Sequence, residues 1–103
     1  MMIARWSITA KFGYKQDLLK LMNQWLDEIG PQVGYTRDNQ RILTGSIGVA
    51  ESVIQTETQV KDLAELNATW EKLANIPAHQ QWGKEIEPYV VSGSNRWEIY
   101  RLL

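Results

Sequence analysis

Residues 5–30 read RWSITAKFGYKQDLLKLMNQWLDEIG, and their hydrophobic period changes at Gly13. Before the glycine, apolar and polar side chains alternate, which is typical of a strand with one buried face; the apolar members are Trp6, Ile8, Ala10 and Phe12. After it, apolar residues recur every three or four positions, as on one face of a helix; they are Leu18, Leu19, Met22, Trp25, Leu26 and Ile29. Gly30 and Pro31 follow and end the pattern. The stretch therefore predicts a strand followed by an amphipathic helix.

Two further strands are predicted within residues 41–60, which are rich in Val, Ile and Thr. Gly45 and Gly48 mark a turn or bulge between them, so the segment forms a hairpin. The C-terminal residues 94–103, SNRWEIYRLL, alternate again and predict a last strand. On that strand Trp97 and Ile99 fall on one face, and Arg96, Glu98 and Tyr100 on the other.

Two helices are predicted between the hairpin and the last strand. Asp62, with Glu65 three residues later, resembles a capping box at the start of the first of them. Pro77 is expected at the first position of a second, shorter helix that ends before Pro88. The element order is then β-α-β-β-α-β, so we predict one α+β domain over residues 1–103. Its fold is ferredoxin-like, a four-stranded antiparallel sheet with helices on one face and the other face open.

The composition excludes several classes of protein. The chain has 103 residues, of which 44% are hydrophobic, and a formal net charge of -1. That balance is unlike a disordered tail, and unlike a nucleic-acid-binding protein with its basic stripe. The sequence has no Cys, which excludes disulfides and thiolate chemistry. No signal peptide and no apolar run of about 20 residues is visible, so we expect a soluble cytoplasmic protein without membrane contact.

The only histidine, His79, lies on the short helix in the stretch PAHQQWGKEIEP, residues 77–88. His79 shares one helical face with Trp82, Gly83 and Ile86, so it is expected to point inward. A histidine there could act as a general base or as a hydrogen-bond donor to a ligand. Because no second titratable group lies near it in the sequence, the pattern favours a structural histidine bonded to a backbone carbonyl.

The five tryptophans are distributed one to each major element. In a short chain, such large rings more often pack in the hydrophobic core or in an interface than line a ligand-binding site. Three of them, Trp6, Trp70 and Trp82, could nevertheless converge on one cleft between the sheet and the helices. Each indole carries a single N–H donor that needs a partner, which suits a polar ligand or water.

The element order, the segment DLAELNATWEKLANIPAHQQWGK (62–84) and the ending VVSGSNRWEIYRLL (90–103) resemble the dimeric α+β barrel superfamily, and in particular its small NIPSNAP-like members. The resemblance implies that two ferredoxin-like subunits pair sheet to sheet, each with a cleft for a small organic molecule between its sheet and its helices. Members of the superfamily include cofactor-independent monooxygenases acting on polyphenols, haem-degrading monooxygenases, isomerases and proteins with no assigned activity.

We therefore expect a homodimer that pairs through an apolar open sheet face and binds a small hydrophobic or aromatic molecule, which it could oxidise or isomerise without a cofactor. His79 is the candidate catalytic residue. Trp6, Trp70 and Trp82 are the candidate walls, and Tyr100 a candidate hydrogen-bond donor. The competing hypothesis is a dimeric binding or interaction module without catalysis. No metal site is expected, because one His and no Cys cannot form an ordinary zinc site.

Haem degradation is a further alternative that the resemblance raises. In that branch a helix carries a Trp, and a His about ten residues later ligates the iron, an order that Trp70 and His79 share. An Asn on the first strand completes the family's set. Here that strand offers only Ser7 and Thr9 as small polar groups, so the Asn is missing.

Overall fold

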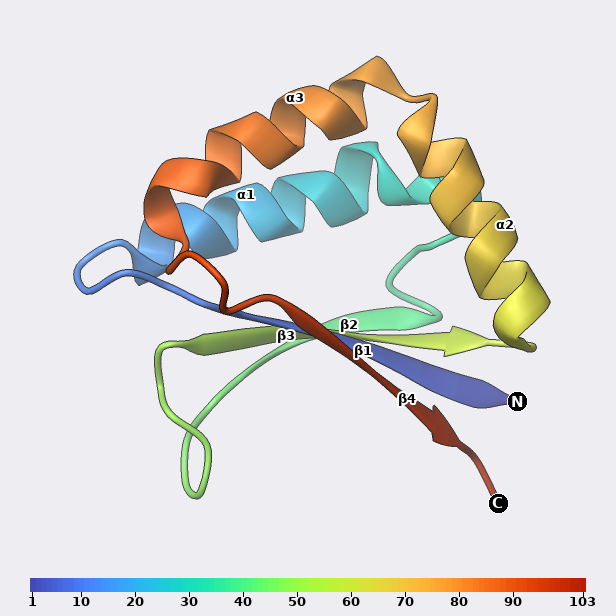
Figure 1. Cartoon of the computed structure of the whole chain (residues 1–103), viewed down its shortest axis with the longest axis horizontal. Coiled ribbons are helices and arrows are strands. Elements are labelled where there is room, and N and C mark those ends of the chain that lie inside the picture. The colour runs from blue at the N-terminus through green and yellow to red at the C-terminus, as the bar shows by residue number, and fades with distance from the viewer.

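The computed structural model describes residues 1–103 as a four-stranded antiparallel sheet covered on one face by three helices (Figure 1). The strand order is β2-β3-β1-β4, with β1 and β3 at the centre. The α+β ferredoxin-like prediction is confirmed. In chain order the elements are β1 (Met2–Thr9), α1 (Lys15–Glu28), the 3-10 helix η1 (Gly30–Val33), β2 (Gln40–Thr44), β3 (Val53–Val60), α2 (Leu63–Ala74), α3 (Pro77–Ile86), the 3-10 helix η2 (Glu87–Tyr89) and β4 (Arg96–Arg101). No helix combines the length and the apolar character that crossing a bilayer requires.

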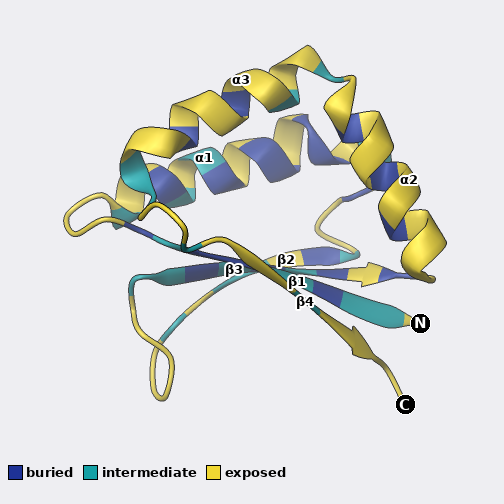
Figure 2. Cartoon of the chain, viewed as in Figure 1, coloured by how far each residue is buried: buried dark blue, intermediate teal, exposed yellow.

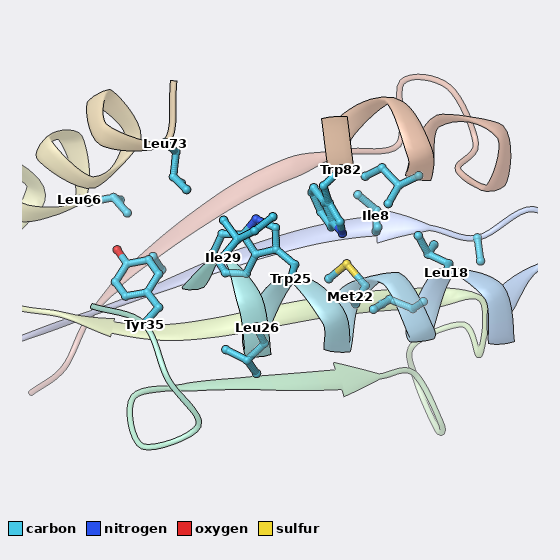
Figure 3. Close-up of a cluster of buried hydrophobic side chains, with 14 of the residues drawn as sticks. Ile8, Leu18, Met22, Trp25, Leu26, Ile29, Tyr35, Leu66, Leu73 and Trp82 are labelled. Atoms are coloured by element: carbon cyan, nitrogen blue, oxygen red, sulfur yellow. The ribbon is translucent and has the colours of Figure 1, made fainter. Parts of the chain in front are cut away.

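The main core lies between the sheet and α1, where side chains of the predicted apolar faces meet (Figures 2 and 3). Ile8 on β1 and Leu18 and Leu26 on α1 are almost completely buried. Burial of one such side chain contributes about 1.5–3 kcal/mol to stability. The alternation on β1 and the helical period on α1 therefore identified the faces that pack together.

The first strand ends earlier than its alternation predicts. Regular pairing stops at Thr9, and Ala10 makes only an isolated bridge to Val90. Phe12, predicted on the buried face, is fully exposed in the turn that follows. Gly13 in that turn has a φ of 86°, a conformation that glycine adopts without strain. The prediction for Phe12 is wrong because the chain has already left the sheet.

Helix α2 begins as the sequence predicts. The side chain of Asp62 accepts a hydrogen bond of 2.8 Å from the backbone N–H of Glu65. The Glu65 carboxylate in turn accepts from the backbone N–H of Lys61. Helix α3 begins at Pro77 and continues to Ile86. Because these residues set where α2 and α3 begin, they also determine which residues of the two helices face inward.

The sheet face away from the helices is polar at its centre, so the prediction of an apolar open face is wrong there. The Glu57 carboxylate bonds Arg41 at 2.7 Å and Arg5 at 2.9 Å. Against the effect of burial, these bonds hold the pKa of Glu57 below its ordinary value. Beside them Gln55 donates to the Ser7 hydroxyl at 2.9 Å. The polar half of the β1 alternation meets polar residues of β3, and together they occupy the middle of this face.

Candidate functional site

A cavity of about 550 Å³ lies between the sheet and the helices, within the range of small-molecule sites. Sixteen residues line it, eleven of them hydrophobic, and none is Lys, Arg, Asp or Glu. Such a space favours an uncharged, largely apolar occupant, because an ion would lose its hydration without gaining a partner. The lining includes all five tryptophans, Trp6, Trp25, Trp70, Trp82 and Trp97, together with His79 and Gly83.

The indole rings form a connected wall. Trp6 on β1 lies 6.2 Å from Trp82 on α3 and 6.4 Å from Trp97 on β4, measured between ring centroids. Trp25 on α1 lies 6.1 Å from Trp82, and both rings belong to the buried cluster in Figure 3. The Trp82 N–H donates to the Leu21 carbonyl at 2.7 Å, which fixes this ring between α3 and α1.

Two of the tryptophans remain accessible and form the rim of the cavity. Trp70 on α2 is 40% exposed and Trp97 on β4 is 45% exposed. Their ring centroids are 5.2 Å apart in an edge-to-face arrangement. A molecule that enters between α2 and β4 would meet these two rings first.

Gly83 contributes open space to the wall of α3. A Cβ built at this position would meet nothing within 4 Å. Glycine in a helix interior costs about 1 kcal/mol relative to alanine, and no neighbouring side chain or backbone requires it here. The missing side chain instead leaves the cavity larger.

His79 is half-buried and interacts with two indoles. The Trp25 Nε1–H donates to His79 Nδ1 at 2.9 Å. The imidazole also stacks on Trp82, with centroids 5.9 Å apart and an angle of 19° between the rings. Burial lowers the pKa of His79 below its ordinary value. The ring is therefore neutral at pH 7.

The hydrogen bond also fixes the tautomer of His79. A neutral imidazole whose Nδ1 accepts a hydrogen bond carries its proton on Nε2. No side chain or backbone group of the protein accepts from that Nε2–H, which leaves it available as a donor. The accessible nitrogen is thus suited to donating a hydrogen bond to a ligand and unsuited to removing a proton from one.

The same bond does not fit a haem iron. A histidine that ligates a metal through Nε2 carries its proton on Nδ1 and donates it to a carbonyl, a carboxylate or water. In this structure Nδ1 faces the N–H of Trp25, so that tautomer would bring two donors together. Ser7, one of the two polar groups offered by strand one, is engaged on the opposite sheet face by Gln55.

Most, but not all, of the predicted site residues lie together in the structure. Trp6, Trp70, Trp82 and His79 line the same cavity. Tyr100 does not line it, because it lies on the open face of β4, where Arg5 stands 5.1 Å from the centre of its ring. The parity of the strand explains this: Trp97 pairs with Trp6 beneath the helices, and Tyr100, three residues on, is on the other face.

Three features of the cavity were not predicted from the sequence. The partner of His79 is the Trp25 side chain, and not a backbone carbonyl. Two buried polar residues, Tyr35 and Gln40, also line the cavity. Tyr35 lies in the polar connection after α1, which has no hydrophobic period, and Gln40 is the first residue of β2. Nowhere do three His, Cys, Asp or Glu side chains lie together in an arrangement that could hold a metal ion.

The pH dependence of stability tests the state of His79. In the unfolded chain His79 takes up a proton near pH 6.5, whereas in the folded chain it does so only at lower pH. The free energy of unfolding should therefore fall as the pH decreases through about 6.5. In His79→Gln, which retains an acceptor for Trp25, it should fall less. Urea unfolding at pH 7.5 and pH 5.5 measures both; equal losses in the two proteins would contradict the assignment.

Comparisons with known proteins agree on the fold. No family model matches the sequence, and no curated protein matches it significantly. A NIPSNAP family protein from Agrobacterium tumefaciens str. C58 is 18% identical with a TM-score of 0.82, over 99% of this chain and 85% of that one. A proposed antibiotic biosynthesis monooxygenase from Nitrosomonas europaea is 10% identical with a TM-score of 0.71, over 100% and 99%. A dimeric ferredoxin-like protein of unknown function from Bacteroides fragilis NCTC 9343 is 11% identical with a TM-score of 0.65, over 98% and 96%. The chain therefore has the ferredoxin-like fold of NIPSNAP family structures, in agreement with the resemblance in its sequence.

Proposed function

We propose that this protein binds a small, uncharged hydrophobic or aromatic molecule in the tryptophan-lined cavity. The observation that carries the proposal is the cavity itself, about 550 Å³ in volume with no charged side chain in its lining. Aromatic walls gain about 0.5–1.5 kcal/mol for each ring that they stack, beyond the area buried. The accessible rim formed by Trp70 and Trp97 and the open position at Gly83 both support a binding role.

His79 would act in this site as a hydrogen-bond donor. Its Nε2–H is the available polar group of the imidazole, and the hydrogen bond from Trp25 and the stacking on Trp82 hold the ring in place. A hydroxyl or carbonyl oxygen of the ligand is the natural acceptor. This role corresponds to the hydrogen-bond donor that the sequence suggested, whereas nothing in the site supports a general base.

Occlusion of the cavity tests the proposed binding. In Gly83→Phe a ring would occupy the open space beside α3, so affinity for a neutral hydrophobic dye such as Nile red should fall at least tenfold. Ala78→Phe is the matched control, because Ala78 is exposed on the same helix and does not line the cavity. Fluorescence titration gives the dissociation constants. Absence of saturable binding to the original protein, or equal loss in both variants, would contradict the proposal.

A second candidate function is cofactor-independent oxygenation of the bound molecule, with dioxygen as co-substrate. It is supported by two similar structures that are described as antibiotic biosynthesis monooxygenases. If the protein has this activity, quinols should be consumed with oxygen uptake above the protein-free rate. His79→Ala should lower the enzymatic part, because the donor to the substrate oxygen is lost. Oxygen uptake that never exceeds the protein-free rate would leave the binding module as the function.

We further propose that two copies of the chain form a homodimer through the open sheet face. The dimeric ferredoxin-like protein from Bacteroides fragilis supports this assembly. So do the apolar side chains at the margins of that face that are not buried within one chain, which are Ile3, Leu43 and Tyr100. Apolar side chains gathered in one exposed region often mark an interface.

Light scattering after gel filtration tests the dimer. At micromolar concentration the protein should have twice the mass of one chain. Leu43→Arg places a charge at the margin of the open face and should increase the monomer fraction, because an unpaired charge is costly to bury. Gln16→Arg, exposed on α1, should leave the mass unchanged. A monomeric mass for the original protein would rule out the assembly.

A further inference from the structure

Two buried polar atoms, on residues that line the cavity, have no hydrogen-bond partner. They are the Tyr35 hydroxyl and the Gln40 Oε1 atom. Both residues are only 6% exposed, and both line the cavity. Most buried polar groups in native proteins are paired, and leaving one unpaired costs about 1–3 kcal/mol. Two such atoms in one cavity therefore indicate a missing partner there.

The Gln40 amide is held in one orientation. Its Nε2–H donates to the Thr58 hydroxyl at 2.6 Å. Thr58 is the direct register partner of Gln40 across β2 and β3, and it is itself buried. With the nitrogen engaged, Oε1 is left as an acceptor that needs a donor.

Tyr35 is fixed by the turn that precedes β2. Its backbone N–H donates to the Gly30 carbonyl at 2.8 Å, and its ring lies in the buried cluster with the hydroxyl turned towards Leu66 of α2 (Figure 3). Burial raises the pKa of Tyr35; the polar side chain of Thr69, close to the phenol but outside hydrogen-bond geometry, lowers it; and the negative charge of Glu65 raises it further. The group is a neutral phenol at pH 7, able both to donate and to accept.

We propose that Tyr35 and Gln40 form a polar anchor that binds a neutral ligand through a hydroxyl group. The inference rests on the proposed function. A ligand hydroxyl donates to Gln40 Oε1 and accepts from the Tyr35 O–H, so it pairs both atoms at once. An ether or ketone supplies no donor and leaves Gln40 unpaired. A carboxylate would meet the Gln40 carbonyl and the field of Glu65 without any cation in the lining.

The anchor determines how a ligand is oriented. Tyr35 and Gln40 are deeply buried, while Trp70 and Trp97 form the exposed rim. The ligand hydroxyl therefore binds at the inner end, and the apolar body extends along the indoles towards the opening between α2 and β4. The ligand class is an aromatic or alicyclic alcohol or phenol without a charged group.

Calorimetric titration with three probes at pH 7 tests the anchor: 2-naphthol, 2-methoxynaphthalene and 2-naphthoate. The original protein should bind 2-naphthol roughly tenfold or more tightly than its methyl ether, the factor expected for one to two hydrogen bonds. Tyr35→Phe removes only the phenol oxygen and should reduce this ratio severalfold, as should Gln40→Met. Tyr89→Phe, a change of the same kind in η2 outside the cavity, should preserve the ratio.

The outcomes separate the anchor from the proposed function. If no naphthalene binds the original protein, the cavity is not a binding site and both proposals fail. If 2-naphthol and its ether bind with similar affinity, and Tyr35→Phe changes neither, binding stands but water alone satisfies the two atoms, and the anchor is overturned. Tightest binding of 2-naphthoate would overturn the neutral ligand class. Circular dichroism confirms that each variant is folded before titration.

Discussion

The hydrogen bond from Trp25 to His79 is the interaction on which the rest of the site depends. It joins α1 to α3 across the top of the cavity, 54 residues apart in the chain. Burial keeps the imidazole neutral, and a proton added at Nδ1 would in addition face the indole N–H. The hydrogen bond also directs the remaining proton to Nε2, an arrangement that suits the donor role proposed for this histidine and does not suit a metal ligand. One side-chain contact thereby determines which chemistry the cavity can support.

The cavity as a whole has two different ends. Indoles and aliphatic side chains form the walls and the rim. Burial and stacking there would favour binding but would not set the orientation of a ligand. Tyr35 and Gln40 lie at the inner end, and in the proposed binding mode their two unpaired atoms orient the ligand. Affinity from apolar area and orientation from a few polar groups is the usual division of roles in small-molecule sites. The absence of charge in the lining is the reason for proposing a neutral ligand.

The sequence predicted the fold well, because hydrophobic period and capping are local signals. The alternation on β1, the Asp62 cap and the start at Pro77 all appear where expected. It also predicted that His79 faces inward, since helical spacing alone decides that. It could not predict that Trp25 is the partner of His79, because the relative placement of α1 and α3 depends on tertiary packing. Tyr35 escaped for a related reason, since a residue in a turn has no periodic pattern to show which way it points.

The five indoles surround a space that a small molecule can enter, and they do not form a filled core. A crystal structure determined under xenon pressure tests this most directly, because xenon occupies apolar cavities without needing a specific contact. We expect xenon among the rings of Trp6, Trp25 and Trp82, with the hydrogen bond from Trp25 to His79 intact. A structure that holds no xenon between the sheet and the helices would contradict it.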